Sequence, residues 1–382
     1  MASPSIWLSA GEFSGDVHGS RLAAALLRQQ PAMRLMGMGG DSMREAGVET
    51  LFHINELSVM GFTEVLGQLP RILRLLKNIE EVLKREKTSA LVVIDAPSFH
   101  FRVIKIAEKL GIPVYYYISP KAWAWRKSRA KFIKEHVRKL ISILPFEVDF
   151  YRQFDMEIDY VGNPLIEIVN YSSIKDIEPE EHHIGFLPGS RKKEITTLMP
   201  AFSGAAEIMH KANPQFRFSC FMAPNMEESF LRSHWLSSAP LDIFVPENRW
   251  AAMRQCELLI AASGTVTLES AIAGVPTIAA YKVSPLTYGL AKHVLTIPYI
   301  SLANLILNEE IVPECIQGAC DPAPLAQKAL DILNPVNKVH NRQKTLAKFD
   351  ILRKLLGEPG VVDRAAQCIY EDMATLGIKG IE

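Results

Sequence analysis

The sequence predicts an α/β protein of two αβα domains, each built on a parallel β-sheet, with a ligand cleft between them. Short β-branched and apolar runs alternate with helical patterns along the chain, which is typical of βαβ units. The chain has 382 residues, more than one ordinary hydrophobic core accommodates. The polar, acidic segment 166–183 interrupts the alternation just after the GNP sequence at 162–164, so we place the domain junction there.

The first domain is expected to span 1–165. Its apolar runs predict five strands and its 3.6-residue periodicity predicts four helices between them. The strands are expected at 6–10, 34–38, 91–94, 114–118 and 140–144, and the helices near 18–29, 69–86, 100–110 and 125–136. A last helix, within 359–382, is expected to join this domain from the end of the chain.

The second domain, 166–358, restarts the same rhythm. Strands are expected at 184–187, 216–222, 242–245, 258–262 and 277–281. The helix after the first of them has apolar residues at 195, 198, 199, 202, 206 and 209, a regular helical stripe that Pro200 interrupts, so we expect a kink or a later start. Ligands bind outside the carboxyl ends of parallel strands, and we therefore look for the site in the loops that follow them.

Composition excludes several classes of protein. Lys plus Arg and Asp plus Glu both number 42, so there is no overall charge to attract nucleic acid. Five cysteines without a CxxC pair predict neither a disulfide framework nor a zinc site. The N-terminus lacks the pattern of a signal peptide, and no long apolar segment is free of Glu, Gly or Pro. We therefore expect a cytoplasmic protein.

Two of three glycine-rich strand-to-helix junctions could hold a phosphate. The first junction, AGEFSGDVHGS (10–20), lacks the GxGxxG spacing of a dinucleotide fold. In the second, LPGSRKKE (187–194), Gly189 and Ser190 open a helix and Arg191 follows. Free N–H groups at a helix start attract anions, and a guanidinium can bind two oxygens of a diphosphate. A capped surface helix with a solvated basic turn is the competing interpretation.

The third junction, SGTVTLESAIAGVP (263–276), gives the strongest signal of a nucleotide-sugar donor. Ser263, Gly264 and Thr265 turn the chain after a strand, and a helix carrying Thr267 follows. Glu269 lies within this apolar helix, where residue 266 is Val, so a capping box does not explain it. Ribose hydroxyls would satisfy the carboxylate, and an ion pair with a nearby Lys or Arg is the alternative.

These motifs together resemble the lipid-A-disaccharide synthase family, which are inverting glycosyltransferases of GT-B type, with two Rossmann-like αβα domains facing each other across a cleft. The matching segments run in family order across most of the chain: GEFSGDVHG (11–19), GMGGDSMREAGVE (37–49), ELSVMGFTEVL (56–66), IDAPSFHFR (94–102), SPKAWAWR (119–126), LPFEVDFY (144–151), YVGNPL (160–165), LPGSRKKEI (187–195), SGTVTLESAIAGVP (263–276) and SLANLIL (301–307).

The resemblance implies the substrates. The donor would be UDP-2,3-diacylglucosamine, held by the C-terminal domain. The acceptor would be 2,3-diacylglucosamine 1-phosphate (lipid X), held by the N-terminal domain. The products would be the β-1′,6-linked lipid A disaccharide 1-phosphate and UDP, made at the cytoplasmic face of the inner membrane of Gram-negative bacteria. A homodimer is also compatible with the sequence.

The carboxylate that activates the acceptor hydroxyl is expected to be Asp95, at the carboxyl end of a predicted strand. A helix cap or turn residue before Pro97 is the alternative. The family commonly has a second acid and an Asn in this stretch, where Ser98 and His100 stand here. Asp16 is the second candidate, with a capping role as its alternative.

The leaving diphosphate is expected to be stabilised by Arg191, by the N–H groups around Gly189 and Ser190, and by the helix start after Gly264. By resemblance Asn304 adds an amide, with a helix cap as the alternative. Ala303 stands where Pro is common in the family, a minor change. The chain has no DxD triplet, so no metal and no other cofactor is expected.

The acceptor and its acyl chains are expected to contact Ser14, Gly15, Leu69, Leu73, Leu76, Trp123 and Trp125. The segment 66–86 is apolar on one helical face and carries several Lys and Arg, as in a helix that lies on anionic lipid. An ordinary surface helix has the same pattern. Buried packing explains the two tryptophans equally well.

Three other functions remain as alternatives. Another UDP-sugar enzyme of the same fold, such as an epimerase, would react without an acceptor. A dinucleotide-dependent oxidoreductase would bind NAD at 10–20, against which the glycine spacing argues. A lipid-binding module without activity would bind acylated glucosamine and release no UDP.

Overall fold

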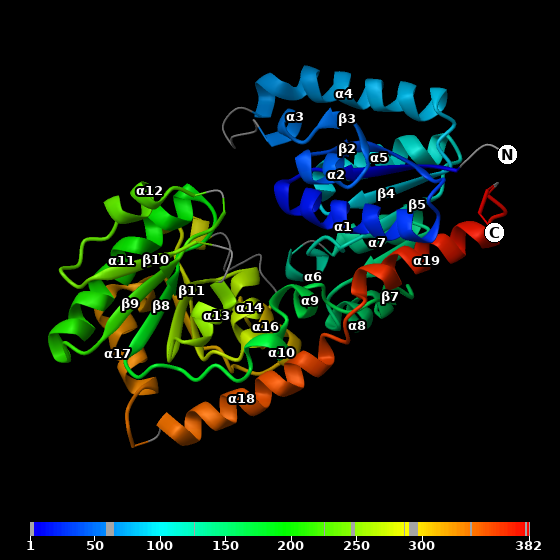
Figure 1. Ribbon diagram of the computed structural model, residues 1–382. Helices are drawn as coiled ribbons and strands as arrows, with labels where there is room; N and C mark the ends of the chain where they lie inside the picture. The colour runs from blue at the N-terminus through cyan, green and yellow to red at the C-terminus, as the bar shows by residue number, and fades with distance from the viewer. Residues whose placement is uncertain are drawn as a thin grey trace. The chain divides into compact units, whose positions relative to one another are not determined.

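The chain folds into two compact units, residues 1–164 with 358–382 and residues 165–357 (Figure 1). The computed structural model describes residues 4–58, 65–125, 127–224, 226–245, 249–285, 287–289, 297–336, 338–378 and 380–381. Within that part of the chain, no helix combines the length and apolar character that a membrane span requires.

Unit 1 is built on a seven-stranded sheet in the order β3-β2-β1-β4-β5-β6-β7. All of its strand pairs are parallel. The strands are β1 (Ser5–Ala10), β2 (Arg34–Gly39), β3 (Glu49–His53), β4 (Ala90–Ile94), β5 (Val114–Tyr117), β6 (Lys139–Ser142) and β7 (Asp159–Tyr160). The central strands β1 and β4 are apolar and buried throughout, as expected for a sheet covered on both faces.

Nine helices of unit 1 lie within the described residues. They are α1 (Phe13–Gln29), α2 (Asp41–Glu45), α3 (Asn55–Ser58), α4 (Val65–Arg85), α5 (Pro97–Lys109), α6 (Ala122–Trp125), α7 (Ser128–His136), α8 (Phe146–Arg152) and α19 (Val361–Thr375). Leu22 and Leu26 of α1 share one core with Ala365 and Ile369 of α19. The last helix therefore completes the unit that the N-terminus begins (Figure 1).

Unit 2 repeats the plan with a six-stranded sheet in the order β10-β9-β8-β11-β12-β13, again with parallel pairs. Its strands are β8 (His183–Leu187), β9 (Arg217–Phe221), β10 (Leu241–Phe244), β11 (Leu258–Ala262), β12 (Thr277–Tyr281) and β13 (Glu314–Ile316). Its described helices are α9 (Leu165–Val169), α10 (Tyr171–Ile174), α11 (Lys192–Ala212), α12 (Glu228–Ser233), α13 (Arg249–Arg254), α14 (Thr265–Ala273), α16 (Leu302–Leu307), the 3₁₀ helix Gln317–Cys320, α17 (Pro322–Ile332) and α18 (Lys338–Leu355).

Both sheets have the strand order of a doubly wound Rossmann-like fold. In each, the chain starts at a central strand, moves to one edge, and returns to continue on the other side of its first strand. The predicted α/β class with parallel sheets is confirmed. Helix α11 runs through Pro200 without a break, so the expected late start is wrong; Ala201 and Phe202, just beyond the proline, are buried in the unit.

Candidate functional site

The two positions where the strand order reverses carry most of the predicted site residues. Ligands bind at such switch points, outside the carboxyl ends of the strands. In unit 1 the reversal lies between β1 and β4, which pair up to Ala10 and Ile94. In unit 2 it lies between β8 and β11, which pair up to Leu187 and Ala261. Each unit thus offers one such edge, and the two differ in chemistry.

In unit 1, Asp95 follows β4 directly and lies on a strained turn. Asp95 and Ala96 have φ of 51° and 43°, the left-handed region that side chains with a Cβ rarely adopt. Such residues cost roughly 1–3 kcal/mol each and persist where the surroundings hold them, often at functional sites. The carbonyl oxygen of Asp95 accepts hydrogen bonds from His100 Nδ1 and from the Tyr116 hydroxyl, both at 2.7 Å. These two contacts hold the turn.

The carboxyl group of Asp95 is half-buried, and burial raises its pKa. The negative charge of Glu12 adds to the increase, while Lys121 and Arg129 oppose it. A carboxylate with a raised pKa is a stronger base than one in water and still has an exposed part to reach a ligand. This electrostatic setting suits the base that the sequence predicts at Asp95.

The loop after β1 packs tightly against this turn. A Cβ at Gly11 would lie 2.4 Å from that of Ala96, so only glycine allows the approach. Ser14 is exposed in the first turn of α1, and Gly15 is buried against Ala10 and the carbonyl of Ile94. The structure therefore brings Ser14 to the edge of the sheet that carries Asp95, and Gly15 makes the close packing possible.

Asp16 has a structural set of contacts. Its buried carboxylate accepts backbone N–H bonds from Gly40 (2.6 Å), Ser42 (3.1 Å) and Met43 (3.1 Å), which cap the short helix α2. A Cβ at Gly40 would lie 2.6 Å from a carboxylate oxygen, so the glycine makes room for the cap. The geometry favours the capping alternative that the sequence left open for Asp16.

Trp123 is buried and belongs to a polar network at the ends of β5 and β6. Its Nε1 donates to Glu147 at 2.9 Å, and the other carboxyl oxygen of Glu147 is bonded to the Ser142 hydroxyl. Complete burial raises the pKa of Glu147 to about 7. The sequence reasoning missed Glu147, although an acid in the apolar run PFEVDFY is a signal for it. The side chain of Trp125 lies outside the described residues.

In unit 2, Arg191 lies at the N-cap of α11 with its side chain exposed. Glu194, one turn into the helix, folds back so that its oxygens meet Arg191 Nη1 at 3.0 Å and the Ser190 N–H at 3.3 Å. Gly189 has a φ of 104°, and a Cβ there would lie 2.4 Å from the same carboxylate. The guanidinium and the Ser190 N–H, both predicted to bind a diphosphate, thus meet a carboxylate of the chain itself.

In the loop after β11 and the helix α14 that follows it, some of the predicted site residues are exposed and others are buried. Thr265 is exposed, while Ser263 and Gly264 are half-buried. The Thr267 hydroxyl is buried and donates to the Gly264 carbonyl at 2.8 Å, so it closes the first turn of α14. Glu269 is also buried, and its Oε2 is paired with Arg249 and lies 3.4 Å from Trp250 Nε1. The ion pair is the alternative that the sequence left open.

Asn304 is fully buried and its amide is fully used. Its Nδ2 donates to the Val312 carbonyl (2.7 Å) and to Glu314 (3.0 Å), and its Oδ1 accepts from the N–H groups of Ile311 and Val312, both at 2.9 Å. These bonds fasten the loop between α16 and β13. The geometry favours a structural role for Asn304, because its side chain is buried and all of its polar atoms have partners within the chain.

The amphipathic helix α4 divides its apolar residues between two directions. Leu69 and Leu73 are 46% and 55% exposed, whereas Leu75 and Leu76 are 4% and 7% exposed. Leu76 packs inside unit 1, which corrects its assignment to the lipid-facing side. Leu69 and Leu73 remain a small exposed apolar surface on this helix.

Among the described residues, no group of three His, Cys, Asp or Glu could hold a metal ion.

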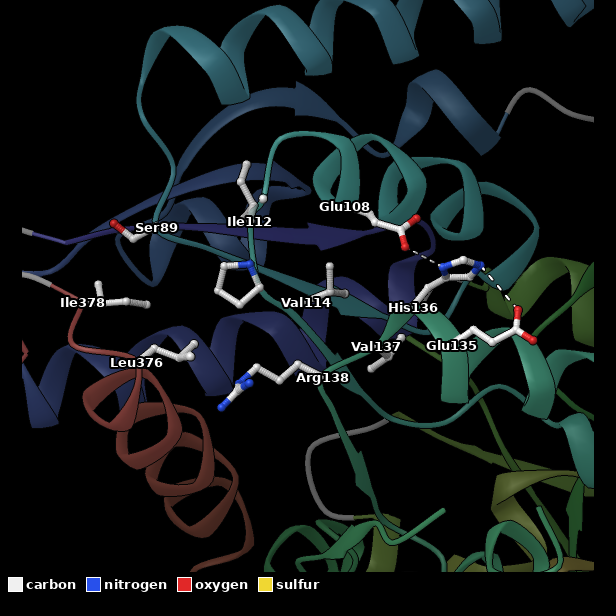
Figure 2. Close-up of a pocket in the computed structure, with 12 residues that line it drawn as sticks. Ser89, Glu108, Ile112, Val114, Glu135, His136, Val137, Arg138, Leu376 and Ile378 are labelled. Carbon is white, nitrogen blue, oxygen red and sulfur yellow. Dashed lines mark hydrogen bonds and ion pairs between the residues drawn. The ribbon is translucent and has the colours of Figure 1, made fainter. Parts of the chain in front are cut away.

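A surface hollow of about 700 Å³ lies at the opposite edge of the unit 1 sheet. Its lining includes the residues that precede β4, β5 and β6, so it faces the amino ends of the strands. Figure 2 shows His136 between Glu108 and Glu135, with Nδ1 3.0 Å from Glu108 and Nε2 3.8 Å from Glu135. The described residues that line it include none of the predicted site residues.

Comparison with known proteins identifies the family. The family model described as lipid-A-disaccharide synthetase matches residues 6–358. The lipid-A-disaccharide synthase of Syntrophus aciditrophicus is 34% identical over 374 residues, covering 96% of this chain and 97% of that protein. That of Myxococcus xanthus is 35% identical over 375 residues, with coverage of 96% and 97%.

Solved structures with low sequence identity share the fold. A putative UDP-N-acetylglucosamine 2-epimerase from Listeria monocytogenes has a TM-score of 0.66 at 12% identity and covers 98% of both chains. The UDP-GlcNAc 2-epimerase of Neisseria meningitidis, solved bound to UDP-GlcNAc, has a TM-score of 0.58 at 11% identity, covering 98% of this chain and 100% of that one. This likeness and the two Rossmann-like units confirm the GT-B type. With the family match over nearly the whole chain, this protein is a glycosyltransferase that belongs to the lipid-A-disaccharide synthase family.

Proposed function

We propose that this chain transfers 2,3-diacylglucosamine from UDP-2,3-diacylglucosamine to lipid X, giving the β-1′,6-linked disaccharide 1-phosphate and UDP. Unit 2 would hold the donor and unit 1 the acceptor. The observation that carries the residue assignment is the contrast between the two switch points. One has a carboxyl group of raised pKa on a strained turn held by two hydrogen bonds, and the other has a guanidinium and the Ser190 N–H on the Glu194 carboxylate.

Asp95 would act as the general base. Inverting transfer requires the acceptor hydroxyl to attack the anomeric carbon as the bond to UDP breaks. The carboxylate takes the hydroxyl proton in the transition state, and positioned bases of this kind contribute roughly 10²–10⁴-fold in rate. Burial favours this transfer because it raises the pKa of Asp95 towards that of a useful base.

The leaving UDP would be stabilised in unit 2. Arg191 and the N–H groups at the start of α11 would meet the diphosphate, together with the start of α14 after Gly264. Glu194 now bonds to the Ser190 N–H and to Arg191, so the diphosphate would replace a carboxylate as their partner. Because the donor set already fits one anion, it needs little rearrangement to fit another.

Glu269 would accept a hydroxyl of the ribose. The contacts from Arg249 and Trp250 both go to Oε2. We assign the ribose contact to Oε1, the second oxygen of the same carboxylate. The Arg249 ion pair would then orient the Glu269 carboxyl group towards the ribose hydroxyl. On this proposal, the ion pair and the ribose contact coexist.

The membrane contact would be made by α4. Leu69 and Leu73 are exposed, and Arg71, Arg74 and Lys77 flank them on the same helix, a combination suited to anionic lipid. We expect Leu69→Ser with Leu73→Ser to remain folded and to sediment less with vesicles that contain anionic lipid. Ile351→Ser, which replaces another exposed apolar residue on α18, is the matched control. Equal sedimentation of both variants would argue against the interfacial role.

UDP release tests the reaction itself. The protein is mixed with UDP-2,3-diacylglucosamine, with and without lipid X, and UDP and the disaccharide are measured. We expect both products only when lipid X is present, and no change in excess chelator. Release of UDP, or epimerisation of the sugar, without the acceptor would instead favour another UDP-sugar enzyme of the same fold.

A further inference from the structure

We propose that His100 is a positioning residue for the candidate base: its neutral imidazole, with the proton on Nδ1, holds the Asp95 carbonyl and thereby fixes the direction of the Asp95 carboxylate. This inference rests on the proposed function, because it assigns His100 a role through Asp95. His100 does not touch the substrate on this proposal. It acts only through the strained turn.

The contacts of His100 define the arrangement. The ring is fully buried in α5, one turn beyond the Asp95–Ala96 turn. Nδ1 lies 2.7 Å from the Asp95 carbonyl oxygen, and Nε2 lies 3.0 Å from the Ser9 hydroxyl near the end of β1. The imidazole therefore joins the two strands on either side of the unit 1 switch point, β1 and β4.

The partners of the ring decide its protonation. A carbonyl oxygen can only accept, so Nδ1 carries the proton of the bond to Asp95. Burial lowers the pKa of His100 to about 4, so the ring is neutral at physiological pH. Nε2 then has a lone pair and accepts from the Ser9 hydroxyl. Both ring nitrogens are satisfied in this one tautomer.

The turn needs such an anchor because its backbone is strained. Asp95 and Ala96 both adopt left-handed conformations, which relax once nothing holds them. The anchored atom is the carbonyl of the same residue that carries the candidate base. Loss of the bond would let the carboxylate shift, and a displacement of about 1 Å costs about a hundredfold in rate. Tyr116 supplies the second bond to the same oxygen.

A pair of substitutions separates the two ring nitrogens. The amide nitrogen of Asn is as many bonds from Cα as Nδ1 of His, and that of Gln is as many as Nε2. His100→Asn can therefore keep the bond to Asp95 and lose Ser9, while His100→Gln can keep Ser9 and lose Asp95. Ser9→Ala removes the Ser9 bond alone and is the control. Tyr116→Phe removes the second donor to the carbonyl and hardly changes the side-chain volume.

The measurement is kcat and the KM for lipid X in the UDP-release assay, with the circular dichroism spectrum and the urea unfolding midpoint of each variant as a check of folding. We expect His100→Gln to lower kcat by about 10–100-fold with a nearly unchanged KM, and Tyr116→Phe to lower it less. His100→Asn and Ser9→Ala should stay within a few-fold of wild type. Wild-type kcat in His100→Gln, or equal losses in the Asn and Gln variants, would overturn the inference. Absence of lipid X-dependent release by the wild type would instead overturn the proposed function.

Discussion

The two switch points share one topology and differ in what they present. In unit 1, the chain between β4 and α5 is strained, and the groups at its end are side chains: the Asp95 carboxyl, with His100 and Tyr116 behind it. In unit 2, the loop after β8 contains Gly189 with a positive φ, and it presents the Ser190 N–H and Arg191 to the Glu194 carboxylate. One geometry suits proton transfer and the other suits charge stabilisation, so a single fold plan supplies two different chemistries.

The largest expected effect comes from removing the candidate base of unit 1, Asp95. Asp95→Asn keeps the shape of the side chain and removes the base, so UDP release in the presence of lipid X should fall by roughly 10²–10⁴-fold. UDP binding, measured by calorimetry, should stay unchanged because the residues that we propose to bind UDP lie in unit 2. Ser98→Ala, an exposed neighbour in the same segment, is the control. Weaker UDP binding in Asp95→Asn would contradict the proposal that unit 1 supplies the base while unit 2 binds UDP.

A pH experiment sharpens the description of unit 1. Burial raises the pKa of Glu147 to about 7 from an ordinary 4.5, so the folded chain holds this proton more tightly than the unfolded chain. The contribution of this proton to the free energy of unfolding is therefore complete below the pKa that Glu147 has in the unfolded chain. It is lost as the pH rises through about 7, and the loss is on the order of 3 kcal/mol. Glu147→Gln mimics the neutral form and should flatten this dependence.

The measurement is the free energy of unfolding in urea at about pH 5 and about pH 9. Relative to the wild type, Glu147→Gln should have a higher free energy of unfolding at about pH 9 than at about pH 5. Asp149→Asn, on the exposed side of the same helix, should follow the wild type at both values. Parallel behaviour of all three proteins would show that Glu147 ionises as it does in the unfolded chain.

On the unit 2 side, Arg191→Ala tests charge stabilisation. Removal of one group that stabilises developing charge costs about a hundredfold in kcat, and we expect a loss of that order in UDP release. Lys193→Ala, an exposed cation two residues along, should have little effect. If the two variants lose activity equally, the general positive charge of the segment matters rather than the position of the guanidinium.

The smallest expected effect concerns Glu194, which competes for the same donors as the diphosphate. Glu194→Gln removes the negative charge and should lower the dissociation constant of UDP by up to about fivefold, since exposed ion pairs are weak. Glu207→Gln, on the same helix and bound to the 237–238 turn, is the control. Weaker UDP binding in Glu194→Gln would show that the carboxylate shapes the loop more than it blocks it.

Local signals explain which parts of the fold were predictable. Strands such as β1, β4 and β11 are buried apolar runs, and their positions follow from the sequence. The strands β3, β7 and β13 were missed because they are edge strands with mostly half-buried residues, which leave no apolar run; β7 and β13 are also only two and three residues long. The left-handed turn at Asp95 was not predicted either, since one of the two side chains that hold it, Tyr116, comes from another strand.

The site residues, too, were predictable where the signal is local and unpredictable where it depends on contacts made by the fold. Asp95 could be placed because it directly follows a strand that the sequence predicts, and Arg191 because it lies in the glycine-containing loop after another predicted strand. The structural contacts of Asp16 and Asn304 could not be predicted, because their hydrogen-bond partners around Gly40 and Val312 meet them only through the fold. For Leu76, the helical periodicity showed that it lies on the apolar face of α4. It could not show which residues of that face pack against the rest of unit 1 and which stay exposed.

The return of α19 to unit 1 has a consequence for biosynthesis. Unit 2 is a continuous stretch of chain, 165–357, and every residue of it is available once that stretch has been made. Unit 1 is not, because Val361, Ala365 and Ile369 fill its core beside α1. The half of the protein that is synthesised first must therefore wait, with an apolar face of α1 uncovered, until the other half is finished. During translation the second unit is free to complete its fold before the first.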